Sequence, residues 1–174
     1  PDILKGLRDF GILAVQGYGL TECAPLAAVN RDKFYCDSSA GLATPNATLE
    51  IVDAAEDGTG DIRFKGENIM LGYYKAPELT AEVIVDGWLY TGDMAEMDED
   101  GFIYLVDRKK DVIISGGENL YPVQIENFLS RHEAVKDVAV IGLQDDRLGE
   151  IRVLAQVQGA GVAHIGYGLQ RRRY

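Results

Sequence analysis

Residues 88–93 read Trp-Leu-Tyr-Thr-Gly-Asp, an apolar stretch that ends in a Gly-Asp pair. Downstream, residues 106–111 read Val-Asp-Arg-Lys-Lys-Asp and residues 115–119 read Ser-Gly-Gly-Glu-Asn. Far upstream, residues 17–22 read Gly-Tyr-Gly-Leu-Thr-Glu. The rest of the chain is organised around these four stretches.

The segment from about residue 40 to residue 106 has the pattern of short strands separated by turns. Turn sequences stand at 57–60 and 98–101, and Pro77 can open a short helix that ends near the Asp-Gly pair at 86–87. Four runs are typical of strands, namely 48–52, 61–64, 94–97 and 102–106. Many short strands at this spacing predict a small β-barrel or sandwich.

The N-terminal flank is expected to be the end of an α/β domain. Residues 2–9 place apolar side chains at helical spacing, and Gly11 is a plausible stop. The apolar run 12–15 is expected to be a buried strand that leads into a loop at 17–19, where glycine lets the backbone approach a ligand closely. A single strand makes no α/β sheet, so residues 1–39 are expected to end a larger domain.

Beyond the charged run 107–111, the sequence predicts an α+β unit. Pro122 stands near the start of a helix whose apolar face is formed by Ile125, Phe128 and Leu129. Three runs are typical of strands, namely 112–114, 138–141 and 151–157. Residues 159–174 show no periodicity, and we expect a loop or disorder there.

The composition excludes several classes of function. The formal net charge of −11 argues against a nucleic-acid surface, because phosphate binding depends mainly on Lys and Arg. No run approaches the roughly 18 apolar residues of a membrane span, and no signal peptide opens the chain. Cys23 and Cys36 have neither zinc spacing nor a disulfide-scaffold pattern, which favours a reducing, cytoplasmic compartment. With two histidines, a histidine-rich metal site is disfavoured.

Residues 17–22 have the chemistry of a nucleotide site, although a plain turn is the simpler explanation of two glycines alone. Glu22 stands where a dinucleotide fingerprint needs its third glycine. The Thr21 hydroxyl can bond a phosphate oxygen, and the Glu22 carboxylate can ligate magnesium, which takes hard oxygen ligands. Asp93 fits a turn or cap residue, or a carboxylate that accepts hydrogen bonds from both ribose hydroxyls. Trp88 is expected to pack in the core.

Residues 96–107 imitate a calcium-binding loop, with Gly101 at the position of the sharp turn. However, the first position is Glu96, the twelfth is Asp107, and the flanks are predicted strands instead of helices. An acidic β-hairpin turn is therefore the favoured interpretation.

Taken together and in this order, the four stretches closely resemble the acyl-adenylate-forming superfamily, which includes acyl-CoA ligases, peptide-synthetase adenylation domains and beetle luciferases. Ser-Gly-Gly-Glu-Asn followed by Tyr121-Pro122 is most similar to the fatty acyl-CoA ligase branch. The resemblance covers roughly residues 1–157. It implies an α+β chain with the end of the large AMP-binding domain at 1–39, a distorted antiparallel β-barrel subdomain at 40–107, and a partial small C-terminal domain at 108–158.

The resemblance also implies roles for individual residues. Tyr18 and its flanking backbone, Gly17 and Gly19, would line the adenine pocket. Thr21 would contact the α-phosphate and Glu22 would hold Mg2+, which makes these two the catalytic candidates.

In the same way, the resemblance gives Asp93 and Arg108 contacts with the ribose of ATP or AMP. Lys110 would be the hinge between the large and small domains. The small residues Ser115, Gly116 and Gly117 would approach the pantetheine arm of CoA.

Two parts that the family needs are not in this sequence. There is no Ser/Thr/Gly-rich loop ending in Lys-Gly to cradle the triphosphate, and there is no lysine after Lys136 to stabilise charge in the adenylation step. The chain is therefore expected to be a fragment of an ATP-dependent fatty acyl-CoA ligase that uses a carboxylic acid, ATP, Mg2+ and CoA, and to be inactive alone. The alternative is a stand-alone adenine-nucleotide-binding or regulatory module.

Overall fold

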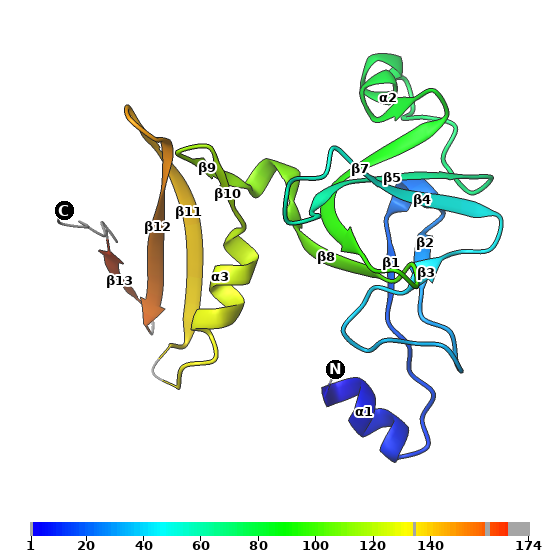
Figure 1. Cartoon of the computed structure of the whole chain (residues 1–174), viewed down its shortest axis with the longest axis horizontal. Coiled ribbons are helices and arrows are strands. Elements are labelled where there is room, and N and C mark those ends of the chain that lie inside the picture. The colour runs from blue at the N-terminus through cyan, green and yellow to red at the C-terminus, as the bar shows by residue number, and fades with distance from the viewer. Residues whose placement is uncertain (1, 134, 159–160, 167–174) are drawn as a thin grey trace. The chain divides into compact units, whose positions relative to one another are not determined.

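The computed structural model describes residues 2–133, 135–158 and 161–166 (Figure 1). The chain divides into two compact units: the first unit is Pro1–Leu105 and the second unit is Val106–Tyr174. No helix within the described ranges is long and apolar enough to cross a membrane.

The first unit is built mainly from short antiparallel strands. Its elements are α1 (Asp2–Asp9), β1 (Gly17–Gly19), the 3-10 helix η1 (Thr21–Cys23), β2 (Leu26–Val29), β3 (Leu42–Ala43), β4 (Ala47–Val52), β5 (Gly60–Gly66), α2 (Pro77–Val83), β6 (Ile84–Val85), β7 (Trp88–Met97) and β8 (Ile103–Arg108), which continues into the second unit. One sheet has the order β1-β2-β3, and the other has the order β4-β5-β7-β6, with β8 also paired to β7. The larger sheet curls into a half-barrel (Figure 1), in agreement with the predicted α+β fold with a distorted antiparallel barrel.

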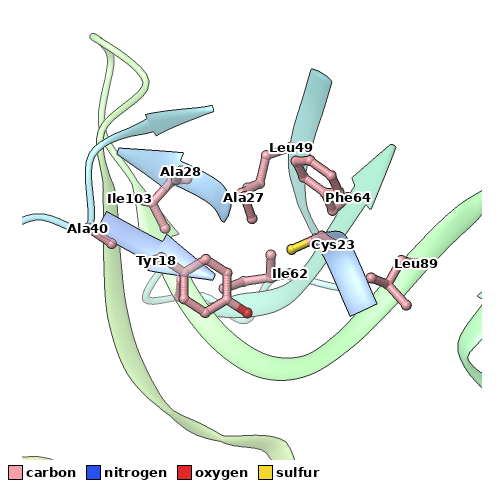
Figure 2. Close-up of a cluster of buried hydrophobic side chains, with 11 residues drawn as sticks. Tyr18, Cys23, Ala27, Ala28, Ala40, Leu49, Ile62, Phe64, Leu89 and Ile103 are labelled. Atoms are coloured by element: carbon pink, nitrogen blue, oxygen red, sulfur yellow. The ribbon is translucent and has the colours of Figure 1, made fainter. Parts of the chain in front are cut away.

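Both sheets contribute to one apolar core. In the larger sheet Leu49 pairs with Phe64 and Ile51 with Ile62, so the alternating apolar positions of β4 and β5 lie on one face. Figure 2 shows the buried cluster, which consists of Tyr18, Cys23, Ala27, Ala28, Ala40, Leu49, Ile62, Phe64, Leu89, Ala95 and Ile103. The core therefore anchors β1 and η1, the elements that carry the upstream motif.

The N-terminal segment confirms the helix at 2–9 but corrects two other predictions. Residues 12–15 form no strand, and Ile12 and Leu13 are 52% and 67% exposed. A strand needs a neighbour for its backbone hydrogen bonds, and the described residues place none beside this run. Residues 17–19, expected as a loop, form strand β1, which pairs with β2.

Two predictions around β7 also need correction. Trp88 is half-buried instead of lying in the core, and the Arg63 guanidinium lies 4.3 Å from its ring centre. The helix opened by Pro77 ends at Val83. Ile84 already belongs to β6, because it pairs with Leu89 across the turn at 86–87.

The acidic segment 98–101 is the turn of the β7–β8 hairpin. Asp98 Oδ1 accepts hydrogen bonds from the backbone N–H groups of Asp100 (3.1 Å) and Phe102 (2.8 Å). Asp98 Oδ2 accepts a third from the Tyr104 hydroxyl at 2.9 Å. Strands β7 and β8 flank this turn and both carboxylate oxygens of Asp98 bond within it, which confirms the predicted acidic hairpin turn.

The two cysteines differ in environment, and we expect them to differ in reactivity. Hydrogen bonds with Ser38 and then Tyr104 lower the pKa of the half-buried Cys36 thiol, whereas burial raises the pKa of the Cys23 thiol. More Cys36 is therefore thiolate at neutral pH, and the thiolate is the nucleophile. Iodoacetamide labelling followed by peptide mass spectrometry should modify Cys36 well before Cys23. Tyr104→Phe should slow the reaction, and equal labelling of both thiols in the folded chain would contradict the expectation.

The second unit is a sheet covered by one helix. Its elements are η2 (Lys109–Asp111), β9 (Ile113–Ser115), β10 (Glu118–Leu120), α3 (Pro122–Leu129), β11 (Asp137–Asp145), β12 (Gly149–Gln158) and β13 (Gly161–Gly166). The sheet order is β10-β9-β12-β11, with β13 also paired to β12. This agrees with the predicted helix at Pro122 and the predicted strands, although β10 was not expected.

Two features of the second unit differ from the prediction, namely the exposure of Phe128 and a strand in the C-terminal segment. Phe128, predicted on the apolar face of α3, is exposed. Glu126 joins α3 to the sheet, because its Oε1 accepts the backbone N–H of Val140 on β11 at 2.8 Å. Residues 161–166 form strand β13 where the sequence predicts loop or disorder. The rest of the 159–174 tail lies outside the described residues.

Candidate functional site

A hydrogen bond joins two motifs that lie 75 residues apart in the sequence. The Tyr18 hydroxyl on β1 donates to Asp93 Oδ2 on β7 at 2.7 Å. The Tyr18 ring is part of the buried cluster (Figure 2). The Asp93 side chain is half-buried. The structure thus brings the predicted adenine-site tyrosine directly to the predicted ribose-site carboxylate.

A wide bulge in β7 places Asp93. Asp61 pairs with Met94 and Arg63 pairs with Tyr90, so Ile62 on β5 lies opposite the three residues Thr91, Gly92 and Asp93. Gly92 takes φ +75°, a conformation that glycine adopts without a Cβ penalty. Bulges of this kind re-aim side chains and are common beside active sites.

Two hydrogen bonds of the Thr91 side chain stabilise this bulge. Its hydroxyl donates to the carbonyl oxygen of Ile62 at 3.2 Å and accepts the backbone N–H of Asp93 at 3.2 Å. These two bonds satisfy backbone groups that the bulge removes from the ladder. Each residue of the Thr-Gly-Asp sequence thus has a part in the bulge. Thr91 supplies the hydroxyl, Gly92 takes the positive φ, and Asp93 is the carboxylate that the bulge presents.

The Thr21-Glu22 pair lies on η1, which follows directly after β1, the strand that carries Tyr18. Thr21 is exposed and Glu22 is half-buried, whereas Cys23 is fully buried and anchors the turn in the core. Glu22 Oε1 accepts a hydrogen bond from the Tyr73 hydroxyl at 2.8 Å. The hydroxyl of Thr21 and the carboxylate of Glu22 are thus presented at the surface of the first unit.

The glycines flanking Tyr18 have a packing role. A Cβ on Gly19 would lie 1.9 Å from the carbonyl oxygen of Pro25, and one on Gly17 would lie 2.9 Å from the carbonyl oxygen of Ala28. The close approach of β2 to β1 therefore explains these glycines without a ligand.

The chemistry of the donor set suits magnesium bound together with a nucleotide. Within residues 2–133, 135–158 and 161–166, no group of three or more His, Cys, Asp or Glu could hold a metal ion. Mg2+ is usually held by one or two carboxylates together with substrate phosphates and water. A single carboxylate such as Glu22 fits that pattern.

Tyrosines beside both carboxylates stay protonated. Burial raises the pKa of Tyr18, and the hydrogen bond to Asp93 and its negative charge act in the same direction. The hydrogen bond to Glu22, followed by burial, raises the pKa of Tyr73. Both phenols therefore remain hydrogen-bond donors throughout the neutral range.

The remaining predicted site residues lie in the second unit. Arg108 and Lys110 are exposed at the end of β8 and in η2. Ser115 pairs with Glu118, and the two residues between them, Gly116 and Gly117, take φ +63° and +88°. Positive φ at both central positions is what a tight two-residue hairpin turn needs, so these glycines have a structural reason as well. Asp93 and Arg108 thus belong to different units.

Sequence reasoning missed two residues that contact η1. Asn68 donates through Nδ2 to the carbonyl oxygens of Cys23 (2.7 Å) and Leu26 (3.0 Å). Tyr73 contacts Glu22 as described above. Both lie about fifty residues from their partners in an irregular segment, and no periodicity or motif in the sequence marks them.

The chain is similar to known acyl-activating enzymes in sequence. Residues 1–74 match the family described as AMP-binding enzyme. The long-chain-fatty-acid–CoA ligase of Salmonella typhimurium is 46% identical over 146 residues, which cover 80% of this chain and 26% of that enzyme. The feruloyl-CoA synthase of an Amycolatopsis species is 41% identical over 157 residues, which cover 86% of this chain and 32% of that enzyme. The chain thus spans about a quarter to a third of these relatives.

Solved structures of acyl-activating enzymes are also similar to this chain. The o-succinylbenzoate CoA synthetase of Bacillus subtilis, in complex with its acyl-adenylate intermediate, superposes with a TM-score of 0.78 at 32% identity, covering 93% of this chain and 35% of that chain. The same enzyme with ATP and magnesium ion gives 0.77. A Mycobacterium tuberculosis fatty acyl CoA synthetase gives 0.63 at 36% identity, covering 88% and 32%. Together, these matches identify the chain as a relative of the AMP-binding, acyl-adenylate-forming enzymes, and its sequence relatives include long-chain-fatty-acid–CoA ligases.

Proposed function

We propose that this chain is part of an ATP-dependent fatty acyl-CoA ligase and that, alone, it retains an adenosine-binding surface without catalysis. The observation that supports this most directly is the Tyr18–Asp93 hydrogen bond, which joins the adenine and ribose candidates in one place. The names of the relatives favour part of a ligase over a stand-alone module.

The parent reaction has two steps. A carboxylate oxygen of the acid attacks the α-phosphorus of ATP, the bond to the bridging oxygen breaks, and pyrophosphate leaves with its electron pair. The sulfur of CoA then attacks the acyl carbon, the bond to AMP breaks, and the thiol proton is lost to base. A bound Mg2+ would neutralise phosphate charge in the first step.

Residues of this chain would act mainly in binding and orientation. Tyr18 and its flanking backbone would line the adenine pocket, and Asp93 would accept hydrogen bonds from the ribose hydroxyls. Thr21 would donate to an α-phosphate oxygen, and Glu22 would hold Mg2+.

In the second unit, Arg108 would add a ribose contact, and the Ser115–Gly117 turn would approach CoA. Rotation about Lys110 would exchange the faces used in the two steps, as hinges do. This proposal assigns residues 1–39 to the large domain, 40–107 to its barrel and 108–158 to the small domain.

We expect no catalysis because the chain lacks the lysine-containing elements that would stabilise negative charge developing in the adenylation step. The sequence has neither a phosphate-cradling Lys loop nor a lysine after Lys136. Donors that stabilise developing charge are commonly worth about 3–4 kcal/mol each, so losing two such elements would leave no measurable turnover.

The test is to titrate the full chain with AMP and with 2′-deoxy-AMP and to measure the two affinities by NMR. Removing one ribose hydroxyl should weaken binding to the unaltered chain about tenfold, because hydrogen bonds to a charged group are worth roughly 1.5–3 kcal/mol. In Asp93→Asn, AMP should bind correspondingly more weakly, and the difference between the two nucleotides should shrink. Asp100→Asn, in the exposed turn 98–101, is the matched control.

Three outcomes would count against the proposal. An unaltered chain that does not bind AMP would remove the adenosine site. An unchanged deoxy penalty in Asp93→Asn would remove the role of Asp93. Acyl-CoA formed from acid, ATP, Mg2+ and CoA by the purified chain would show that the proposed inactivity is wrong.

A further inference from the structure

One irregular segment holds η1 at three points. Asn68 donates to the carbonyl oxygens of Cys23, at the end of η1, and Leu26, at the start of β2. The backbone N–H of Met70 donates to the carbonyl oxygen of Glu22 at 2.7 Å. The Tyr73 hydroxyl donates to the Glu22 carboxylate at 2.8 Å. The main chain and the side chain of Glu22 are thus fixed by the same segment.

The backbone of Tyr73 is held in place by α2. Its backbone N–H donates to Thr80 Oγ1 on α2 at 2.9 Å, and the Thr80 hydroxyl donates to the carbonyl oxygen of Ala76 at 2.9 Å. Gly72, just before Tyr73, takes φ +146°, and a Cβ there would lie 2.9 Å from Thr80 Cγ2. The chain is therefore packed against α2 at the point where the Tyr73 side chain leaves it.

We propose that Tyr73 is a positioning residue for Glu22: its hydroxyl fixes the rotamer of the carboxylate, so that the second oxygen is directed for a divalent cation bound with a nucleotide. This inference rests on the proposed function. A half-buried carboxylate at a turn can adopt several rotamers, and one hydrogen bond to Oε1 selects among them. Partners of this kind, one shell behind a metal ligand, commonly change metal affinity 10- to 100-fold when removed.

The experiment separates the effect on the cation from an effect on the fold. ATP is titrated into the full chain with saturating MgCl2 and again with EDTA, and the ratio of the two affinities is the magnesium-dependent gain. AMP with EDTA reports the adenosine surface alone. Magnesium also changes ATP itself, but this contribution cancels when variants are compared with the unaltered chain.

Tyr73→Phe should reduce the magnesium-dependent gain roughly tenfold and leave metal-free AMP affinity unchanged. Tyr74→Phe is the matched control, because Tyr74 is 87% exposed and its ring lies 5.3 Å from the Lys75 ammonium. Its magnesium-dependent gain should equal that of the unaltered chain. In Glu22→Gln the gain should be largely lost, and adding Tyr73→Phe should reduce it no further.

Each other outcome has a definite meaning. If Tyr73→Phe keeps the full gain, or loses AMP affinity by the same factor as ATP affinity, the positioning role is wrong while the proposed function stands. If the unaltered chain binds AMP but shows no magnesium-dependent gain, the role is likewise wrong. If the unaltered chain binds no nucleotide, the proposed function fails and this inference fails with it.

Discussion

Phe64→Ala is expected to lower the free energy of unfolding of the first unit by about 3–5 kcal/mol. Phe64 is fully buried on β5, and its strand neighbours Leu49 and Leu89 are in the same cluster. Removing the ring forfeits its burial and leaves a cavity, because packed strands on both sides cannot collapse into the space. Urea denaturation, monitored by the fluorescence of Trp88, the single tryptophan of the chain, measures the loss of unfolding free energy in this unit.

Phe10→Ala is the matched control, because that ring is 87% exposed. Its effect should stay within about 0.5 kcal/mol, as for most surface substitutions. A loss below about 1 kcal/mol for Phe64→Ala would mean that the cluster in Figure 2 does not form the core of the unit.

Gly19→Ala is expected to damage both stability and nucleotide binding. The added Cβ would lie 1.9 Å from the carbonyl oxygen of Pro25, which is main chain and cannot rotate away. Either β1 separates from β2 or η1 shifts, and the cost is about 1–3 kcal/mol or more. Both movements displace Tyr18 from Asp93, so AMP affinity should fall by at least about tenfold, beyond what lost stability explains. Urea denaturation and the AMP titration measure the two effects separately.

Gly6→Ala is a suitable comparison for this change. Gly6 lies within α1, and an added Cβ there meets nothing within 4 Å. Because alanine favours helix over glycine by roughly 0.5–1 kcal/mol, this variant should be neutral or slightly more stable. If Gly19→Ala behaved in the same way, the close approach of β2 to β1 would be wrong.

The parts of the fold that the sequence predicts well are those with local signals. Strands β4 and β5 show alternation between clear turns, and α3 begins at a proline. The predicted strand at 12–15 is wrong because apolar character alone does not say whether a neighbouring strand is present. The predicted core position of Trp88 is wrong because a large ring can cover charged side chains such as Arg63 as readily as fill a core.

For the candidate site, the motifs identify residue types but not their contacts. Asp93 is a candidate from sequence because a carboxylate can accept hydrogen bonds from both ribose hydroxyls, but the bulge that presents it depends on the register between β5 and β7. Tyr73 and Asn68 could not be found in this way. Their role exists only through hydrogen bonds to η1, about fifty residues upstream, and nothing in their local sequence records that partner.

The bulge in β7 has a consequence for how this site could change over generations or in the laboratory. In a regular strand, adding or deleting one residue reverses the facing of everything beyond it and would expose the core. Here three residues lie opposite one, so the segment Thr91–Asp93 is separated from the pairing of Tyr90 with Arg63 and of Met94 with Asp61. Length changes confined to these three positions could redirect the carboxylate while Leu89 and Ala95 keep their places in the core. Because the Thr91 hydroxyl and the positive φ of Gly92 hold the bulge, we expect such changes to be tolerated where these two residues are kept.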